Sequence, residues 1–202
     1  MISKHVYSVF MLLISIPTAS WSVDKDCFPP ELIPDKLFPT VKLETSMGNI
    51  EVELNRMRAP ISVNNFLRYV LEGEYDGTIF HRVMSGFVVQ GGGYTKEIEE
   101  KTLYADVLNE SGNGLKNTTG TIAMARYKDP HSATRQFYFN MSDNTSLDPS
   151  SRNWGYTVFG EVITGMDVLQ AIAEVETGYS EDLDAEDVPV TPVLLIRASV
   201  LE

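Results

Sequence analysis

The sequence predicts a mainly β fold, a barrel of short strands whose ends are covered by α-helices. Short apolar or alternating runs recur between residues 41 and 201 and are separated by polar turns. Only two segments space their apolar residues as an amphipathic helix does. The strands therefore do not alternate with helices, as a parallel βαβ sheet would require.

Length and charge limit the classes of function. The 202 residues are enough for one domain with an appendage, and 43% apolar residues can form a sizeable core. The formal net charge is −12. Because no basic patch offsets repulsion by phosphate, we expect no nucleic-acid partner and no binding to anionic lipid.

The first segment, residues 1–22, has the features of a secretory signal peptide. Lys4 supplies a positive start, and the apolar run Val6–Ile16 is too short to span a bilayer, so no stable membrane insertion is expected. Small residues allow cleavage after Ser20 or Ser22. The alternative is a buried hydrophobic helix of the mature domain.

Residues 23–40 are predicted to be a linker. Prolines at positions 29, 30, 34 and 39 remove backbone donors and favour an extended chain. Cys27 is the only cysteine, so no disulfide can form within the chain. We interpret it as an incidental thiol, with pairing between two chains as the alternative.

The first folded elements are a β-hairpin and a helix. Residues 41–55 alternate on both sides of a turn at Met47-Gly48-Asn49, where glycine or asparagine is expected in a left-handed conformation. Pro60 then begins an amphipathic helix, and Gly73 ends it.

The later elements follow from the same patterns. Residues 96–119 are polar and are expected to be a long surface excursion, and the acidic run 181–187 is expected to be poorly structured. The other predicted elements are strands at 120–126, 136–141, 156–162 and 190–201 and a second helix at 166–175.

The central stretch, residues 75–95, combines an apolar patch with Arg82 and Gln90 and ends in three consecutive glycines. A guanidinium beside apolar side chains is costly unless it is paired or used. We assign the neighbouring His81 to structure, as a satisfied hydrogen bonder.

The motif F-H-R-V-x-x-x-F-x-x-Q-G-G in this stretch resembles the signature of cyclophilin-type peptidyl-prolyl cis/trans isomerases. The segments GTIAMAR, QFYFN, YTVFGEV and GMDVLQAI and the pair Leu147-Asp148 are also similar to cyclophilin segments, in cyclophilin order. These segments are most similar to those of bacterial periplasmic cyclophilins. The resemblance implies a closed eight-stranded antiparallel barrel capped by two helices over residues 41–202, an active groove on its outer face, and a periplasmic location.

The implied reaction is rotation about an X–Pro amide, whose barrier of about 18–20 kcal/mol comes from amide resonance. A donor aimed at the proline nitrogen favours the twisted state, because only that state offers a nitrogen lone pair. The family's catalytic arginine corresponds to Arg82. No metal, cofactor or acid–base pair is required.

The resemblance also assigns the substrate-binding residues. Gln90 would hold Arg82 and the substrate carbonyl, Ala125 and Arg126 would grip the residue before proline through backbone hydrogen bonds, and Gln136 lies at a matching position. The proline seat is formed by Phe87, Val88, Tyr138 and Leu147. Ordinary core packing is the alternative for Phe87, Val88 and Leu147, and for Tyr138 the alternative is that Phe137 or Phe139 faces the groove instead. Tyr156 completes this set.

Several groove positions depart from the family pattern. Val88 replaces the usual Met and Tyr138 the usual Phe, so the Tyr138 hydroxyl needs a partner or water. Tyr156 stands where eukaryotic members carry histidine. Ser146 stands where they carry the tryptophan that contacts cyclosporin, so weak cyclosporin binding is expected unless Trp154 refills the wall.

The sequence thus predicts a monomeric, exported isomerase that acts on proline-containing unfolded or partly folded polypeptides. The alternative is a cyclophilin-fold binding module for such segments with little turnover. A hydrolase is disfavoured, because Cys27 lies in the leader and no G-x-S-x-G elbow is present.

Overall fold

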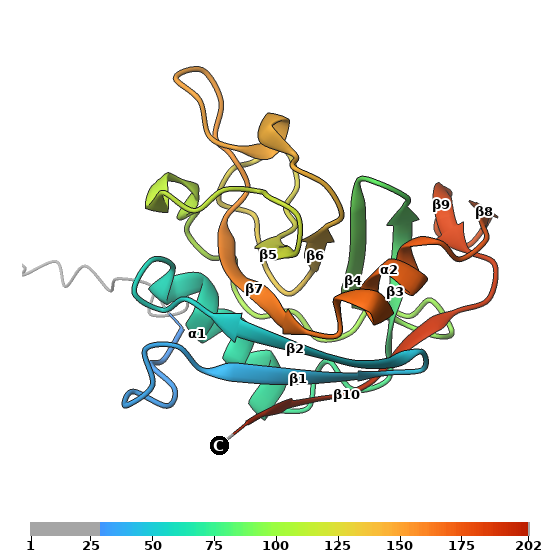
Figure 1. Cartoon of the computed structure of the whole chain (residues 1–202), viewed down its shortest axis with the longest axis horizontal. Helices are drawn as coiled ribbons and strands as arrows, with labels where there is room; N and C mark the ends of the chain where they lie inside the picture. The colour runs from blue at the N-terminus through green and yellow to red at the C-terminus, as the bar shows by residue number, and fades with distance from the viewer. Residues whose placement is uncertain (1–28, 202) are drawn as a thin grey trace, which may run out of the picture.

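The computed structural model describes residues 29–201. Eight antiparallel strands close into a barrel in the order β1-β10-β3-β4-β6-β5-β7-β2 (Figure 1). The predicted closed eight-stranded barrel is therefore confirmed, whereas the predicted signal peptide and Cys27 lie outside the described residues. The strands are β1 (Thr40–Thr45), β2 (Gly48–Leu54), β3 (Thr78–Met84), β4 (Val88–Thr95), β5 (Thr121–Met124), β6 (Phe137–Asn140), β7 (Val158–Thr164) and β10 (Val193–Val200).

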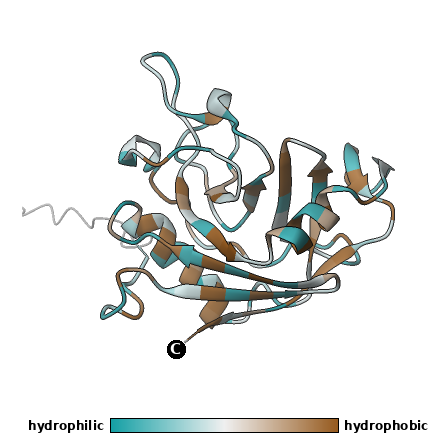
Figure 2. Ribbon diagram, viewed as in Figure 1, coloured by the Kyte–Doolittle hydropathy of each residue, from teal (hydrophilic) through white to brown (hydrophobic). Residues whose placement is uncertain are grey.

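Strands β1 and β2 form the predicted hairpin. Their alternating apolar residues, such as Leu43 and Val52, are fully buried inside the barrel, and Figure 2 shows the corresponding change of hydropathy along both strands. Gly48 has φ of +137°, and a Cβ there would lie 2.8 Å from the Val168 side chain. Glycine is therefore required at this turn for both conformation and space.

Two helices complete the domain, as predicted: α1 (Pro60–Leu71) and α2 (Met166–Ala173). Pro60 occupies the first turn of α1, and Gly73 follows its end with φ of +69°. The α1 residue Phe66 packs against the barrel residues Phe137 and Phe159, with ring centroids 5.4 and 5.2 Å away. Within residues 29–201, no helix has the length and apolarity needed to cross a membrane.

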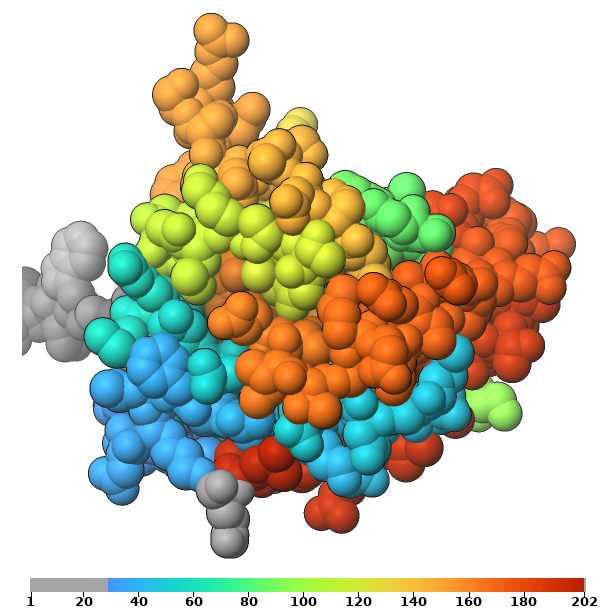
Figure 3. All heavy atoms as spheres, viewed as in Figure 1, coloured from blue at the N-terminus to red at the C-terminus, as the bar shows by residue number. Residues whose placement is uncertain are grey.

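The acidic region near the C-terminus is a β-hairpin, so the prediction of a poorly structured run at 181–187 is wrong. Strands β8 (Thr177–Ser180) and β9 (Ala185–Pro189) form a separate two-stranded sheet beside the barrel, the orange-red lobe of Figure 3. The Tyr179 hydroxyl donates to the Asp184 carboxylate at 2.6 Å. Asp184 has φ of +46°, a conformation that aspartate tolerates better than most residues.

Residues 96–119 are also more structured than the predicted surface excursion. Val107 is 1% exposed and pairs with Ala133 in an isolated bridge. Ser111 begins a short 3₁₀ helix (Ser111–Asn113), and Glu110 accepts hydrogen bonds from the backbone N–H groups of Ile61 and Ser62 at 3.0 and 2.8 Å. This distant carboxylate therefore caps α1, for which the local sequence supplies no side-chain cap.

The proline-rich segment before β1 contains turns and is held against the barrel, in contrast to the expected extended conformation. The Arg56 guanidinium, in a residue only 5% exposed, donates to the carbonyl groups of Ile33 and Lys36 at 2.6 and 2.7 Å. It also donates to the carbonyl of Leu32. One buried cation thus fixes residues 32–36.

Candidate active site

The register of three neighbouring strands places polar side chains together on the outer face of the barrel. Arg82 in β3 lies opposite Gln90 in β4, and Gln90 lies opposite Tyr138 in β6. Because side chains alternate along a strand, Phe137 and Phe139 point into the core while Tyr138 faces outward. Pairing of strands far apart in sequence therefore assembles the site.

A groove of about 250 Å³ opens on this face. It brings together every predicted site residue except Gln136, which lines a smaller adjoining cavity of about 100 Å³ with Gln90, Ala125 and Arg126. The groove is lined by Arg82, Phe87, Val88, Gln90, Ala125, Arg126, Tyr138, Leu147 and Tyr156.

Polar contacts connect the donor side of the groove. The Arg82 Nη1 lies 3.5 Å from Gln90 Oε1, and Gln90 Nε2 donates to Gln136 Oε1 at 2.8 Å. Arg82 Nη2 contacts the Met84 sulfur at 2.9 Å. Among the described residues, Arg82 forms no ion pair with a carboxylate. Its guanidinium is therefore positioned by neutral partners and retains donors for a ligand.

The groove also has an apolar part. Val88 and Tyr138 belong to a small buried cluster with Ala123 and Val158, on which the partly buried Phe87, Leu147 and Tyr156 also pack. The Tyr138 hydroxyl donates to Asn117 Oδ1 at 2.8 Å, so this departure from the family pattern has a protein partner. Burial raises the pKa of Tyr138, which keeps the hydroxyl protonated as a donor.

The Arg126 side chain is held at the edge of the groove. Its guanidinium lies 4.4 Å from the centre of the Tyr156 ring and donates to the Trp154 carbonyl at 3.0 Å. The Trp154 side chain is 54% exposed and does not line the groove, so it does not refill the wall near Ser146. Ser146 itself is exposed in a 3₁₀ turn (Thr145–Leu147).

One of the two backbone polar groups of Ala125 is already hydrogen-bonded within the protein. Its N–H donates to the Gln136 carbonyl at 2.9 Å, so it cannot donate to a substrate at the same time. The predicted backbone grip on the residue before proline would therefore use the Ala125 carbonyl and the Arg126 N–H. An extended peptide offers complementary groups to both.

The sequence did not predict the surroundings of His81 or the hydrogen-bond partner of Tyr138. His81 is 7% exposed, burial lowers its pKa to about 4, and its Nδ1 has no hydrogen-bond partner among the described residues, so the prediction of a satisfied hydrogen bonder is wrong for that atom. Asn117 was not singled out as the partner of Tyr138. The need of a buried tyrosine hydroxyl for a partner was the available signal, but sequence spacing does not identify that partner.

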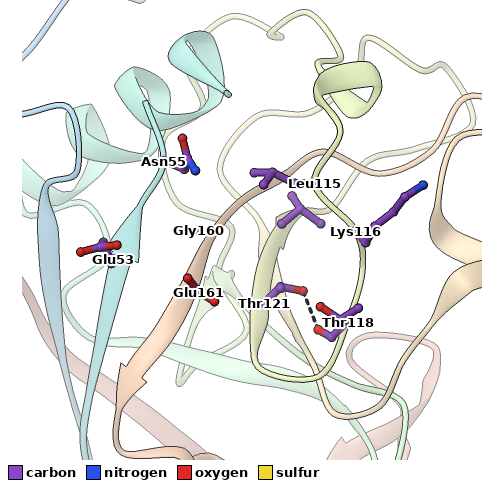
Figure 4. A pocket seen from close by; sticks show the side chains of 9 residues that line it. Glu53, Asn55, Leu115, Lys116, Thr118, Thr121, Gly160 and Glu161 are labelled. Atoms are coloured by element: carbon purple, nitrogen blue, oxygen red, sulfur yellow. Dashed lines mark hydrogen bonds between the residues drawn. The ribbon is translucent and has the colours of Figure 1, made fainter. Parts of the chain in front are cut away.

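Figure 4 shows a separate cavity of about 180 Å³ that shares no residue with the groove. Its labelled residues include Lys116, Thr118 and Thr121, and the Thr121 hydroxyl donates to the Thr118 carbonyl at 2.7 Å. It does not contain Arg82, Gln90 or the apolar seat. The groove around Arg82 is therefore the candidate active site.

Comparisons with known proteins agree with this geometry. The family model described as "Cyclophilin type peptidyl-prolyl cis-trans isomerase/CLD" matches residues 40–200. The peptidyl-prolyl cis-trans isomerase cyp18 of Streptomyces antibioticus is 52% identical over 165 residues, which cover 80% of this chain and 98% of that protein. Peptidyl-prolyl cis-trans isomerase B of Escherichia coli is 46% identical over 159 residues, which cover 76% and 97%.

Solved structures show the same fold. A Cryptosporidium parvum cyclophilin-type isomerase, crystallised in the presence of the dipeptide Ala-Pro, superposes with a TM-score of 0.67 at 24% identity and covers 81% of this chain and 99% of that one. The chain belongs to the family of cyclophilin-type peptidyl-prolyl cis-trans isomerases. Its activity is the isomerisation of X–Pro bonds in proline-containing peptides, which disfavours a binding module without turnover.

Proposed function

We propose that this isomerase accelerates the folding of exported proteins in the periplasm, with Arg82 as the catalytic donor. The signal-like residues 1–22 and the similarity to bacterial isomerases support this assignment. Uncatalysed X–Pro isomerisation takes about 10–100 s at 25 °C, slow enough to limit folding outside the cytoplasm.

The observation that carries the catalytic part is that Arg82 and a set of apolar side chains line the same groove. A proline ring seated against Val88, Tyr138 and Leu147 would present its nitrogen to that guanidinium. In the twisted state this nitrogen becomes pyramidal and accepts a hydrogen bond, whereas in the planar ground state its lone pair is delocalised. The donor therefore stabilises the transition state selectively, and each 1.36 kcal/mol of such stabilisation gives about a tenfold rate increase.

Gln90 has a supporting role in this mechanism. Its carbonyl oxygen lies near Arg82 and its amide nitrogen donates to Gln136, so the orientation of its side chain is fixed. A fixed neutral acceptor holds the guanidinium without neutralising it. The Ala125 carbonyl and the Arg126 N–H would align the substrate backbone before proline.

The proposed role in folding is tested with an exported protein whose refolding is limited by a proline isomerisation. Catalytic amounts of the mature chain should increase the rate of the slow phase, and Arg82→Ala should lose most of this increase. Peptide isomerisation without any effect on refolding would contradict the folding role while leaving the enzyme activity intact.

Export is tested separately by expressing the full chain in a bacterium and sequencing the N-terminus of the periplasmic fraction. We expect a mature chain that begins at Trp21 or Val23, the residues that follow the two predicted cleavage positions. Full-length protein confined to the cytoplasm would contradict the proposed location.

A further inference from the structure

A cluster of three buried asparagines lies directly behind the proline seat. Asn117, Asn140 and Asn144 are 1%, 0% and 7% exposed. Asn140 Nδ2 donates to Asn117 Oδ1 at 3.2 Å, and Asn144 Nδ2 donates to Asn140 Oδ1 at 2.8 Å. Buried amides are costly unless they are hydrogen-bonded, and these three are satisfied by one another and by groups around them, such as Asp148 and Thr121.

Asn117 connects this cluster to two walls of the groove. Its Oδ1 accepts the Tyr138 hydroxyl at 2.8 Å. Its backbone N–H and its Nδ2 both donate to Asp148 Oδ1, at 2.9 and 3.1 Å, and Asp148 directly follows the groove residue Leu147. One side chain thus restrains residues on β6 and on the 3₁₀ turn, which do not pair as strands.

The same cluster reaches the other residues of the seat. The Asn117 carbonyl accepts the Asn144 N–H at 2.8 Å, and Asn144 Nδ2 donates to the Phe87 carbonyl at 2.9 Å. The Leu147 N–H donates to the Asn144 carbonyl at 2.9 Å. Phe87, Tyr138 and Leu147 are therefore all tied, directly or through one residue, to Asn117.

The sequence around Asn117 explains how it is held in place. Leu115, Lys116 and Thr118 line the separate cavity of Figure 4, whereas Asn117 is not among its lining residues and accepts the Tyr138 hydroxyl. Lys116 also forms an ion pair with Asp148 at 3.6 Å. Neighbouring residues thus fix both sides of this segment.

We propose that Asn117 is a positioning residue of the isomerase, which holds the Tyr138 ring and the Leu147 turn at the separation that a proline ring requires. This role rests on the proposed function of the groove. It follows from the hydroxyl of Tyr138: a phenylalanine at that position would be placed by packing alone, whereas a buried tyrosine without an acceptor would have to turn toward water.

The role predicts an effect on substrate binding more than on turnover, because the seat holds the proline ring in both the ground state and the transition state. Asn117→Ala should raise KM for an Ala-Pro peptide about tenfold and change kcat less than about twofold, as expected when the one hydrogen bond that places the Tyr138 ring is lost. The control is Tyr75→Phe, which removes a buried tyrosine hydroxyl that donates to the Arg135 carbonyl at 2.7 Å outside the groove, and should leave KM unchanged.

The decisive comparison repeats Asn117→Ala in a protein that already carries Tyr138→Phe. The KM of the Tyr138→Phe single variant is the reference for the double variant. There, Asn117→Ala should raise KM less than about threefold, because the hydroxyl that Asn117 holds is absent and the backbone N–H at position 117 still donates to Asp148 beside the Leu147 turn. Equal effects of Asn117→Ala in both backgrounds, or an unchanged KM in the folded variant, would overturn the proposal. If Asn117→Ala does not fold, Asn117→Ser is compared in the same two backgrounds, with the same outcomes.

Turnover of the wild-type protein distinguishes a failure of the proposed isomerase function from a failure of the positioning role. If it shows no turnover, the dissociation constant of the Ala-Pro peptide replaces KM in the same set of variants. A dissociation constant unchanged by Asn117→Ala then rejects the positioning role, and an increase of about tenfold that Tyr138→Phe largely removes supports it.

Discussion

Arg82 and Gln90 lie opposite each other on β3 and β4, and the guanidinium Nη1 is 3.5 Å from the amide oxygen. This neutral contact orients the cation and leaves its charge unpaired within the described residues. The pair therefore combines a fixed donor with an open groove, as selective stabilisation of a twisted amide requires.

The first prediction concerns Gln90. Gln90→Glu keeps the shape of the side chain but places a carboxylate beside Arg82, which would then form an ion pair and lose availability to the substrate. We expect kcat/KM for an Ala-Pro peptide to fall about 10–100-fold, from the 1.5–3 kcal/mol typical of a hydrogen bond to a charged group. Activity within twofold of wild type would show that the neutral partner is unimportant.

The second prediction concerns Arg135, a fully buried residue. Its guanidinium donates to the carbonyl groups of Gly92 and Thr102 at 2.6 and 2.8 Å and lies 3.7 Å from the Glu74 carboxylate. Arg135→Met should lower the free energy of unfolding by about 3–5 kcal/mol, because these acceptors lose their donor. Urea denaturation measures this, with the exposed Arg152→Met as control, and a loss below 1 kcal/mol would contradict it.

The third prediction concerns the pH dependence of stability. Burial lowers the pKa of His81 to about 4 from the usual 6.5, so the unfolded state binds the proton more readily. The stability contribution of the neutral imidazole is complete above pH 6.5 and is lost as pH falls toward 4, with a total of about 3 kcal/mol. Denaturation of His81→Gln between pH 7 and 4 should show a weaker decline than wild type, whereas parallel curves would exclude His81 as the cause.

The fourth prediction is weak binding of cyclosporin. Ser146 is exposed and too small to replace an aromatic contact, and the nearby Trp154 side chain does not line the groove. We expect Ser146→Trp to tighten inhibition of peptide isomerisation by at least about tenfold, the scale of one buried aromatic contact. Inhibition of wild type as tight as that of eukaryotic cyclophilins would contradict this prediction.

Local patterns predicted most of the barrel. The β1–β2 hairpin and α1 follow from alternation, Pro60 and glycine signals that act over a few residues. The β8–β9 hairpin was missed because its acidic sequence resembles a solvated loop, and its pairing depends on aspartates with positive φ. The spacing of apolar residues does not predict which residues adopt positive φ.

Site residues that belong to a sequence motif could be predicted, whereas contacts between residues far apart in the sequence could not. The motif located Arg82 and Gln90, and the resemblance placed the other lining residues. Asn117 lies 21 residues from Tyr138, and Arg135 lies 61 residues from Glu74, the carboxylate beside its guanidinium. The spacing of residues along the sequence does not predict such pairs, because only the folded barrel brings the two residues together.

The most direct test of the catalytic claim is steady-state isomerisation of an Ala-Pro peptide by the mature protein, Arg82→Ala and the exposed control Arg152→Ala. Arg82→Ala is expected to lower kcat/KM about 10²–10³-fold, the usual effect of removing one preorganised donor, while the control keeps wild-type activity. Circular dichroism should show that both variants are folded. Wild-type activity in folded Arg82→Ala would contradict the assignment of Arg82 as the donor.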